Sequence, residues 1–161
     1  MKYVLLVRHA ESSLNYNLKD FDRPLNEDGI KDAGLMSEQL MSKNIIPDLI
    51  ISSGANRALE TSKIISSVVQ YSHENIEINN NIYHSTCDDV INIISEVPNG
   101  CNQLMITGHN PTIHFLSQTL TNEQVHKFPT CSMFYIEFNN KEWCNIKKGK
   151  KQFMIYPSLY K

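Results

Sequence analysis

The chain has 161 residues, of which 41% are hydrophobic and 20% are charged, and its formal net charge at pH 7 is −2. These proportions are ordinary for a globular protein and exclude a disordered tail or a fibrous repeat. We therefore predict one domain over residues 1–161. The near-neutral charge gives no general attraction to nucleic acid, so a bound phosphate would depend on a few well-placed groups.

The sequence shows no membrane-spanning or export segment. The apolar run Tyr3–Val7 is too short to cross a bilayer, and no signal-peptide cleavage site follows it. The cysteines form no CxxC pair and have no metal-ligand spacing; they are Cys87, Cys101, Cys131 and Cys144. We expect free thiols in a reducing cytoplasm, with no bound metal and no cofactor.

The first part of the chain alternates between apolar and polar segments. Residues 3–7 form a continuous apolar run, which predicts a strand buried on both faces. Residues 10–26 are polar and irregular, which predicts a loop. Asn26 stands at a helix N-cap position, and apolar residues at helical spacing extend this helix to about Lys43.

The middle of the chain repeats this alternation. Residues 49–51 predict a second strand, and the helical spacing that follows predicts a helix over 58–70. Residues 76–78 predict a weak third strand. Thr86 and Asp89 have the spacing of a capping box, which predicts a third helix after them.

The last third predicts one more helix and several strands. Residues 104–107 predict a strand, and Asn110 followed by Pro111 predicts the start of a helix with Asn110 as its cap. The remaining apolar runs predict three short strands, over 133–138, 143–147 and 152–156, with a turn at Gly149 between the last two.

Strands that alternate with helices predict an α/β fold, with three layers in the order α/β/α and a mainly parallel central sheet. The last third of the chain is expected to add antiparallel edge strands. In such sheets ligands bind beyond the carboxyl ends of the strands, so the residues that follow each strand are the candidates for a site.

Cationic and imidazole side chains follow three of the predicted strands. Arg8 and His9 follow the first strand, Arg57 opens the helix after the second, and His109 follows the fourth. Two helix N-termini at the same edge would add backbone N–H groups. Guanidinium forks, imidazoles and helix N-termini together make a receptor for a tetrahedral oxyanion.

Four segments resemble, in order, the motifs of the histidine phosphatase superfamily, also called the phosphoglycerate mutase-like group. These segments are residues 6–11 (LVRHAE), 23–29 (RPLNEDG), 47–61 (PDLIISSGANRALET) and 107–111 (TGHNP). One departure is Ala10, where the family more often has glycine. The short chain and the Arg-Pro-Leu segment look most like the SixA-type phosphohistidine phosphatases, which implies a phosphoglycerate mutase-like fold with a minimal lid.

The resemblance implies a role for each matching residue. His9 would be the nucleophile, kept neutral by nearby guanidinium charge, and would form a phosphohistidine intermediate. Arg8 and Arg57 would hold the phosphoryl oxygens, and His109 would donate to them as an imidazolium. No metal is needed. The expected substrate-binding residues are Asn15, Asn110 and His84.

The general acid is missing from the positions where relatives of the mutase and acid phosphatase type carry a carboxylate. Residues 82–85 read Ile-Tyr-His-Ser, and Asn110 follows His109. An alkoxide leaving group needs a proton from the enzyme, whereas the imidazole of a phosphohistidine leaves more easily. His84 and Glu11 are the alternative candidates for an acid.

The sequence thus predicts a monomeric, metal-independent phosphatase that acts on phosphohistidine in a signalling protein. The alternatives are a phosphatase for small phosphomonoesters and a non-catalytic phosphate-binding module. A mutase is disfavoured, because residues 70–86 leave no room for a large lid. The lysines of residues 147–151 are interpreted as a solvated edge-strand turn rather than a nucleic-acid site, and we expect no membrane partner.

Overall fold

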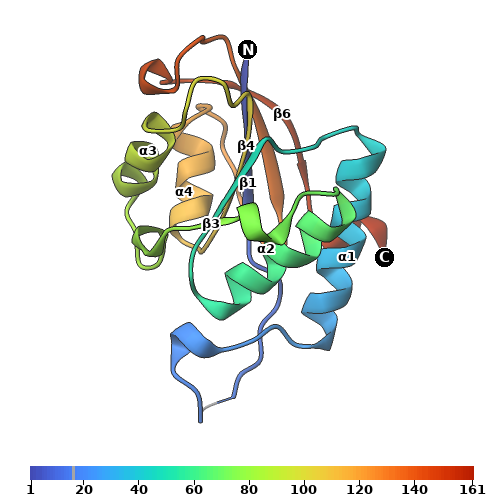
Figure 1. The fold of residues 1–161 in the computed structure, drawn as a ribbon. Helices are drawn as coiled ribbons and strands as arrows, with labels where there is room; N and C mark the ends of the chain where they lie inside the picture. The colour runs from blue at the N-terminus through green and yellow to red at the C-terminus, as the bar shows by residue number, and fades with distance from the viewer. Residues whose placement is uncertain (16) are drawn as a thin grey trace.

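The computed structural model describes residues 1–15 and 17–161, which form a six-stranded sheet between two layers of helices (Figure 1). The strands are β1 Lys2–Arg8, β2 Leu49–Ser52, β3 Glu77–Ile78, β4 Gln103–Gly108, β5 Met133–Phe138 and β6 Lys150–Ile155. Their order in the sheet is β3-β2-β4-β1-β5-β6. Strands β3, β2, β4 and β1 pair in parallel, and β5 and β6 continue the sheet antiparallel. The predicted α/β fold with antiparallel strands added late is confirmed.

Two helices cover each face of the sheet. The α-helices are α1 Glu27–Ser42, α2 Asn56–Val68, α3 Cys87–Ser95 and α4 Thr112–Thr119. Short 3₁₀ turns complete the described elements: η1 Asp20–Asp22, η2 His73–Asn75, η3 Asn80–Ile82, η4 Trp143–Asn145 and η5 Pro157–Tyr160. Helices α1 and α2 pack together on one face, and α3 and α4 pack on the other (Figure 1).

Strand β1 explains why its sequence is a continuous apolar run. Val4 and Leu6 belong to the core under α3 and α4, while Leu5 and Val7 belong to the core under α1 and α2. Alternate residues of a strand point to opposite faces, so a strand covered on both sides needs apolar residues throughout. All four of these side chains are buried.

The predicted helix starts at Asn26 and Thr86 are confirmed. The Asn26 side chain accepts a hydrogen bond of 2.8 Å from the Gly29 N–H. Thr86 accepts from the Asp89 N–H, and Asp89 accepts from the Thr86 N–H, which completes the capping box. Each cap satisfies N–H groups that the helix itself leaves unpaired.

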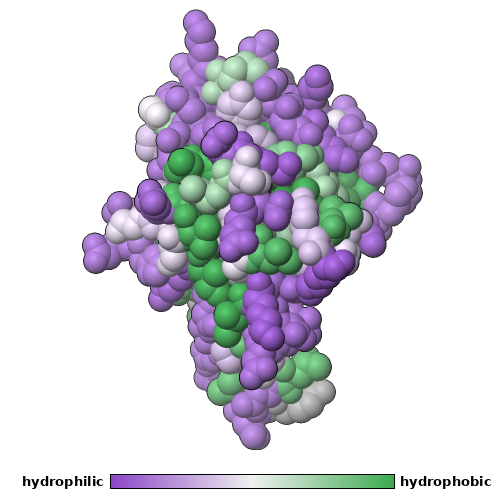
Figure 2. Space-filling model, turned by 90° about the vertical axis from the view of Figure 1, so that its right-hand side faces the viewer, coloured by the Kyte–Doolittle hydropathy of each residue, from purple (hydrophilic) through white to green (hydrophobic). Residues whose placement is uncertain are grey.

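The segment that precedes α1 closely approaches the first turn of that helix. A Cβ atom on Gly29 would lie 2.0 Å from the carbonyl oxygen of Glu11, which only glycine avoids. The Asn26 N–H also donates to this carbonyl oxygen at 3.1 Å. We call this segment, residues 10–15 and 17–26, the lobe. Figure 2 shows the lobe below the body of the molecule, with apolar side chains among hydrophilic ones. The lobe is therefore anchored at its base, next to the end of β1.

The prediction of Asn110 as a helix cap is wrong. Helix α4 begins at Thr112, its N-cap residue is Pro111, and no side chain caps it. The Asn110 side chain instead donates to the carbonyl oxygen of Phe128 at 2.9 Å. A tertiary contact has therefore taken the side chain that local sequence assigned to the helix.

The prediction of a strand over 143–147 is also wrong. This segment forms the 3₁₀ turn η4, in which Trp143 is fully buried and its indole N–H donates to the Cys101 carbonyl oxygen at 2.8 Å. Strand β6 then begins at Lys150 and forms the sheet edge, with the exposed lysines 150 and 151 at its start. The sheet therefore has one strand after β5, not two.

Candidate active site

The candidate site lies at the carboxyl edge of the parallel strands, below the sheet in Figure 1. The His9 N–H donates to the Gly108 carbonyl oxygen, and the Ser53 N–H donates to the Thr107 carbonyl oxygen, so the ends of β1, β4 and β2 lie side by side. Arg57 joins them from the first turn of α2. The structure therefore brings together the four residues predicted as catalytic, and they line one cleft of about 590 Å³.

The imidazole of His9 has a defined tautomer. Its Nδ1 lies 2.7 Å from the Ala10 carbonyl oxygen, which can only accept, so Nδ1 carries the proton. Its Nε2 is then unprotonated and accepts from Arg57 Nε–H at 3.4 Å. Burial, followed by the nearby His109, Arg57 and Arg8, lowers the pKa of His9 to about 3 despite the opposing Ala10 hydrogen bond. His9 is therefore neutral at neutral pH, with the lone pair of a nucleophile on Nε2.

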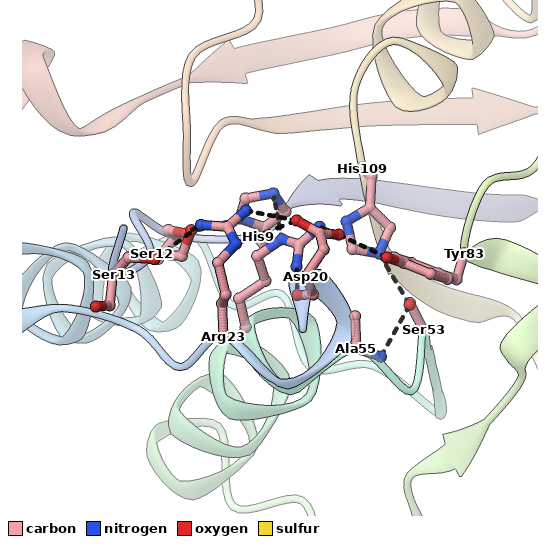
Figure 3. A network of polar contacts seen from close by, with 11 residues as sticks. His9, Ser12, Ser13, Asp20, Arg23, Ser53, Ala55, Tyr83 and His109 are labelled. Atoms are coloured by element: carbon pink, nitrogen blue, oxygen red, sulfur yellow. Dashed lines mark hydrogen bonds and ion pairs between the residues drawn. The ribbon is translucent and has the colours of Figure 1, made fainter. Parts of the chain in front are cut away.

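Arg57 is held by Asp20, a residue that sequence reasoning missed. The Arg57 guanidinium donates to the Asp20 carbonyl oxygen at 2.7 Å and to Asp20 Oδ2 at 3.0 Å. Asp20 Oδ2 also accepts from the Tyr83 hydroxyl at 2.6 Å, and Asp20 Oδ1 pairs with Arg23 at 3.0 Å (Figure 3). One carboxylate therefore links the lobe, α2 and the segment after η3.

Asp20 is not a proton donor in this arrangement. The Tyr83 hydroxyl, then the Arg23 and Arg57 guanidinium groups, hold the pKa of its carboxyl well below the usual range, against a smaller effect of burial. The carboxylate stays ionised, and both oxygens accept hydrogen bonds. No signal in the sequence marks this residue, because the path of the lobe brings it to Arg57.

Arg8 reaches the cleft from the end of β1. Its Nη1 donates to the Phe128 carbonyl oxygen at 3.0 Å, the same oxygen that accepts from Asn110. Its Nε is buried and has no hydrogen-bond partner among the described residues. A guanidinium that is fixed on one side and has a free N–H on the other is suited to bind an anion.

The predicted substrate-binding residues differ in their placement. Asn110 lines the main cleft, and His84 is exposed beside a second cleft of about 270 Å³ that Arg57 and His109 also line. Asn15 lies instead in an exposed turn, where its side chain accepts from the Asn17 N–H at 3.0 Å. The structure therefore brings two of the three residues to the site.

The two alternative candidates for the acid lie at the edges of the site. Glu11 is exposed at the rim of the main cleft, and its carboxylate accepts from the Asn26 side chain at 3.1 Å. The ring centroids of His84 and its neighbour Tyr83 lie 4.0 Å apart. Neither side chain makes a hydrogen bond to the four central residues.

Within residues 1–15 and 17–161, no group of three or more His, Cys, Asp or Glu side chains is placed to hold a metal ion. The four cysteines carry free thiols. Over the same residues, no helix has the length and apolar character needed to cross a membrane.

A family model described as the histidine phosphatase superfamily (branch 1) matches residues 4–83, which include His9 and Arg57. An uncharacterised chloroplastic protein of Arabidopsis thaliana is 30% identical over 149 residues, which cover 87% of this chain and 68% of that protein. The chain belongs to the histidine phosphatase superfamily. The predicted family is thereby confirmed.

Solved structures confirm the fold of this histidine phosphatase. The protein histidine phosphatase SixA complexed with tungstate matches with a TM-score of 0.87 at 18% identity, over 99% of both chains. A mycobacterial glucosyl-3-phosphoglycerate phosphatase matches with a TM-score of 0.69 at 13% identity, over 98% of this chain and 99% of that one. At these identities the likeness extends to the fold, which is phosphoglycerate mutase-like as predicted.

Several site residues lie inside the motifs but were not predicted to act there. Arg23 belongs to the Arg-Pro-Leu segment, and Ser53 belongs to the segment that contains Arg57. The structure adds both to the site, Arg23 through Asp20 and Ser53 through a contact of 2.9 Å with His109 Nε2. Tyr83, which binds Asp20, carried no such signal.

Proposed function

We propose that this histidine phosphatase transfers a phosphoryl group to Nε2 of His9 and then releases it to water. The observation that carries the proposal is the neutral His9, with its proton held on Nδ1 by Ala10 and its Nε2 lone pair beside Arg57. Such an imidazole can attack phosphorus without first losing a proton.

The two steps use the surrounding cations. Nε2 of His9 forms a bond to phosphorus while the bond from phosphorus to the leaving group breaks, and Arg8 and Arg57 bind the phosphoryl oxygens. Water then attacks the phosphohistidine, orthophosphate leaves, and His9 regains its lone pair. Positive charge fixed in advance around the transferred group lowers the barrier to both steps.

The substrate that we propose is a phosphohistidine on a protein, with the domain of residues 1–161 acting as a monomer. Of the described carboxylates at the site, Asp20 is kept ionised by its donors, and Glu11 lies at the rim of the cleft and accepts a hydrogen bond from Asn26. An imidazole leaving group can take its proton from solvent, whereas an alkoxide needs an acid from the enzyme. The likeness to the protein histidine phosphatase SixA complexed with tungstate supports the same substrate.

A phosphatase for small phosphomonoesters is the second candidate. It is favoured by the mycobacterial glucosyl-3-phosphoglycerate phosphatase, which shares the fold with this chain. The two candidates differ in the leaving group, so a comparison of substrates separates them.

The test is the kcat/KM of the purified protein for a phosphohistidine-bearing phosphotransfer domain, measured beside p-nitrophenyl phosphate, sugar phosphates and nucleotides. We expect the phosphohistidine domain to be the best substrate by at least about 100-fold, equivalent to about 2.7 kcal/mol of transition-state binding. A small ester with the higher kcat/KM would instead support the second candidate. Binding of the phosphorylated domain without turnover of any substrate would identify a phosphate-binding module.

A matched pair of histidine variants tests the nucleophile. His9→Ala is expected to lower kcat by at least about 10³-fold, because the covalent route is lost. His126→Ala removes an exposed imidazole and should leave kcat unchanged. Undiminished turnover by His9→Ala would contradict the mechanism.

A further inference from the structure

The ring of His109 lies between Ser53 and the cleft. His109 Nε2 is 2.9 Å from Ser53 Oγ, and Ser53 is fully buried just after β2. The other ring nitrogen, Nδ1, is buried and has no hydrogen-bond partner among the described residues. Figure 3 shows the ring with Ser53 on one side and with His9 and Asp20 on the other.

The partners of Ser53 decide the direction of its hydrogen bond to His109. A hydroxyl group has one proton to donate and two lone pairs to accept with. The Ala55 N–H donates to Ser53 Oγ at 3.2 Å and uses one lone pair. The hydroxyl proton has His109 Nε2 as its acceptor among the described residues. A hydrogen bond from Ser53 to Nε2 therefore satisfies both groups, whereas the reverse bond leaves the hydroxyl proton without a partner.

The charge state of His109 agrees with this direction. Burial first, and then the positive charge of Arg57, lowers the pKa of His109 to about 4, so the ring is neutral at neutral pH. The titratable and charged groups around the ring are Arg57, Asp20, His84, Arg8, His9 and Tyr83. A neutral imidazole carries one N–H group. Because Nε2 accepts the hydrogen bond from Ser53, the proton of the ring is on Nδ1.

We propose that Ser53 is a positioning residue, whose hydroxyl donates to His109 Nε2 and so fixes the tautomer in which Nδ1–H donates to a phosphoryl oxygen. The inference rests on the proposed function, because the phosphoryl group is the acceptor for Nδ1–H. His109 then acts as a neutral donor, in place of the imidazolium expected from the sequence.

The neighbours of the two histidines thereby select the same Nδ1–H tautomer, but they engage opposite ring nitrogens. The Ala10 carbonyl oxygen can only accept, so it holds the proton of His9 on Nδ1 and leaves Nε2 unprotonated, as a nucleophile must be. Ser53 donates to Nε2 of His109 and leaves the proton on Nδ1 free to donate. The ring centroids lie 5.2 Å apart, so one imidazole serves as nucleophile and the other as donor within one cleft.

Long-range proton–nitrogen correlation NMR at pH 7 tests the tautomer, because it distinguishes a protonated ring nitrogen from an unprotonated one. We expect protonated Nδ1 and unprotonated Nε2 on His109 in the wild-type protein and in Ser53→Thr, which keeps the hydroxyl. Ser53→Ala should shift His109 toward the opposite tautomer. A wild-type His109 that is protonated on Nε2 would overturn the proposal.

Kinetics on the phosphohistidine domain give a second readout. Ser53→Ala should lower kcat/KM at pH 7 by about 10-fold, a typical loss when a supporting hydrogen bond to a functional imidazole is removed. The loss should shrink as the pH falls toward the His109 pKa of about 4, because protonation of His109 restores Nδ1–H, and the wild type should show no such trend. An equal loss at every pH, or no loss, would contradict a tautomer role.

The matched control is Ser52→Ala. Ser52 is equally buried and adjacent, but its hydroxyl donates to the Ser53 carbonyl oxygen and makes no hydrogen bond to His109. This variant should keep the wild-type tautomer, the wild-type pH profile and a kcat/KM within about twofold. If the protein hydrolyses neither the phosphohistidine domain nor any phosphate ester, the proposed function is contradicted, while the NMR measurement still decides whether Ser53 sets the tautomer of His109.

Discussion

At the scale of the residue, the site combines a cluster of cations with one carboxylate in their midst. Asp20 accepts hydrogen bonds from Arg57, Arg23 and Tyr83, although its side chain is 49% exposed. A carboxylate at this position opposes the approach of a phosphate dianion and at the same time fixes Arg57. The balance of these two effects can be measured by removing the charge alone.

We predict that Asp20→Asn binds orthophosphate about 3-fold to 10-fold more tightly, because a negative charge beside two arginines is removed at a partly exposed site. Isothermal titration of the free protein with orthophosphate measures this. Glu11→Gln removes the same charge at the rim, where the carboxylate accepts from Asn26 and forms no ion pair with a described arginine, and should change the affinity by less than about twofold. Weaker binding by Asp20→Asn would show that holding Arg57 matters more than repulsion.

At the scale of the element, α1 contains two glycines with opposite surroundings. A Cβ atom on Gly29 would meet the Glu11 backbone, whereas one on Gly34 would meet nothing within 4 Å. Both are glycines within the same helix, so replacement of either by alanine brings a gain in helical propensity. The pair therefore separates the effect of the close contact from the effect of propensity.

We predict that Gly29→Ala lowers the free energy of unfolding by about 1–3 kcal/mol, as overpacking does, and lowers activity by displacing the segment next to His9. Gly34→Ala should raise the free energy of unfolding by about 0.5–1 kcal/mol, because alanine favours the helix. Urea unfolding measures both values. Equal effects of the two substitutions would refute the contact.

The elements that the sequence predicted well are those determined by local pattern. β1 and the helix starts at Asn26 and Thr86 follow from a continuous apolar run and from capping residues. The prediction for residues 143–147 failed because residues 144–147 alternate between apolar and polar as in a strand, whereas buried Trp143 and Ile146 are three residues apart, which suits a 3₁₀ turn. So short a segment is decided by the indole contact with Cys101, which only the folded chain supplies.

The residues of the site likewise fall into those that local sequence predicts and those that only the folded chain brings together. Arg8, His9, Arg57 and His109 could be placed from the sequence, because each follows a recognisable strand and parallel strands end at one edge. Asp20 and Tyr83 could not, because they reach Arg57 through irregular segments whose paths no local pattern sets. The Ser53 contact depends on the register of β2 against β4, which is a property of the assembled sheet.

At the scale of the whole molecule, the buried site makes stability depend on pH. His9 and His109 have pKa values of about 3 and about 4 in the folded chain, against an ordinary 6.5 in the unfolded chain. As pH falls below 6.5, the unfolded chain binds protons that the folded chain does not, so the free energy of unfolding decreases until pH approaches these lower values.

We predict that the free energy of unfolding decreases as the pH falls from about 6.5 to 4, by at most about 1.4 kcal/mol per pH unit for each of the two histidines. The lowered pKa of Asp20 acts only at lower pH, below its ordinary value of 3.8. Urea unfolding at several pH values measures the slope. The double variant His9→Gln, His109→Gln should show a shallower slope, and an unchanged slope would place the proton uptake elsewhere.

We propose that the strand ends, as the whole fold assembles them, make Nε2 of His9 a nucleophile toward phosphorus. Rapid mixing with a phosphohistidine domain, followed by alkaline quenching and mass spectrometry of the peptides, tests this role of His9. We expect a transient phosphoryl group on His9 that appears before orthophosphate and is absent in His9→Ala. Orthophosphate release at the wild-type rate with no phosphorylated His9 at any time would contradict it.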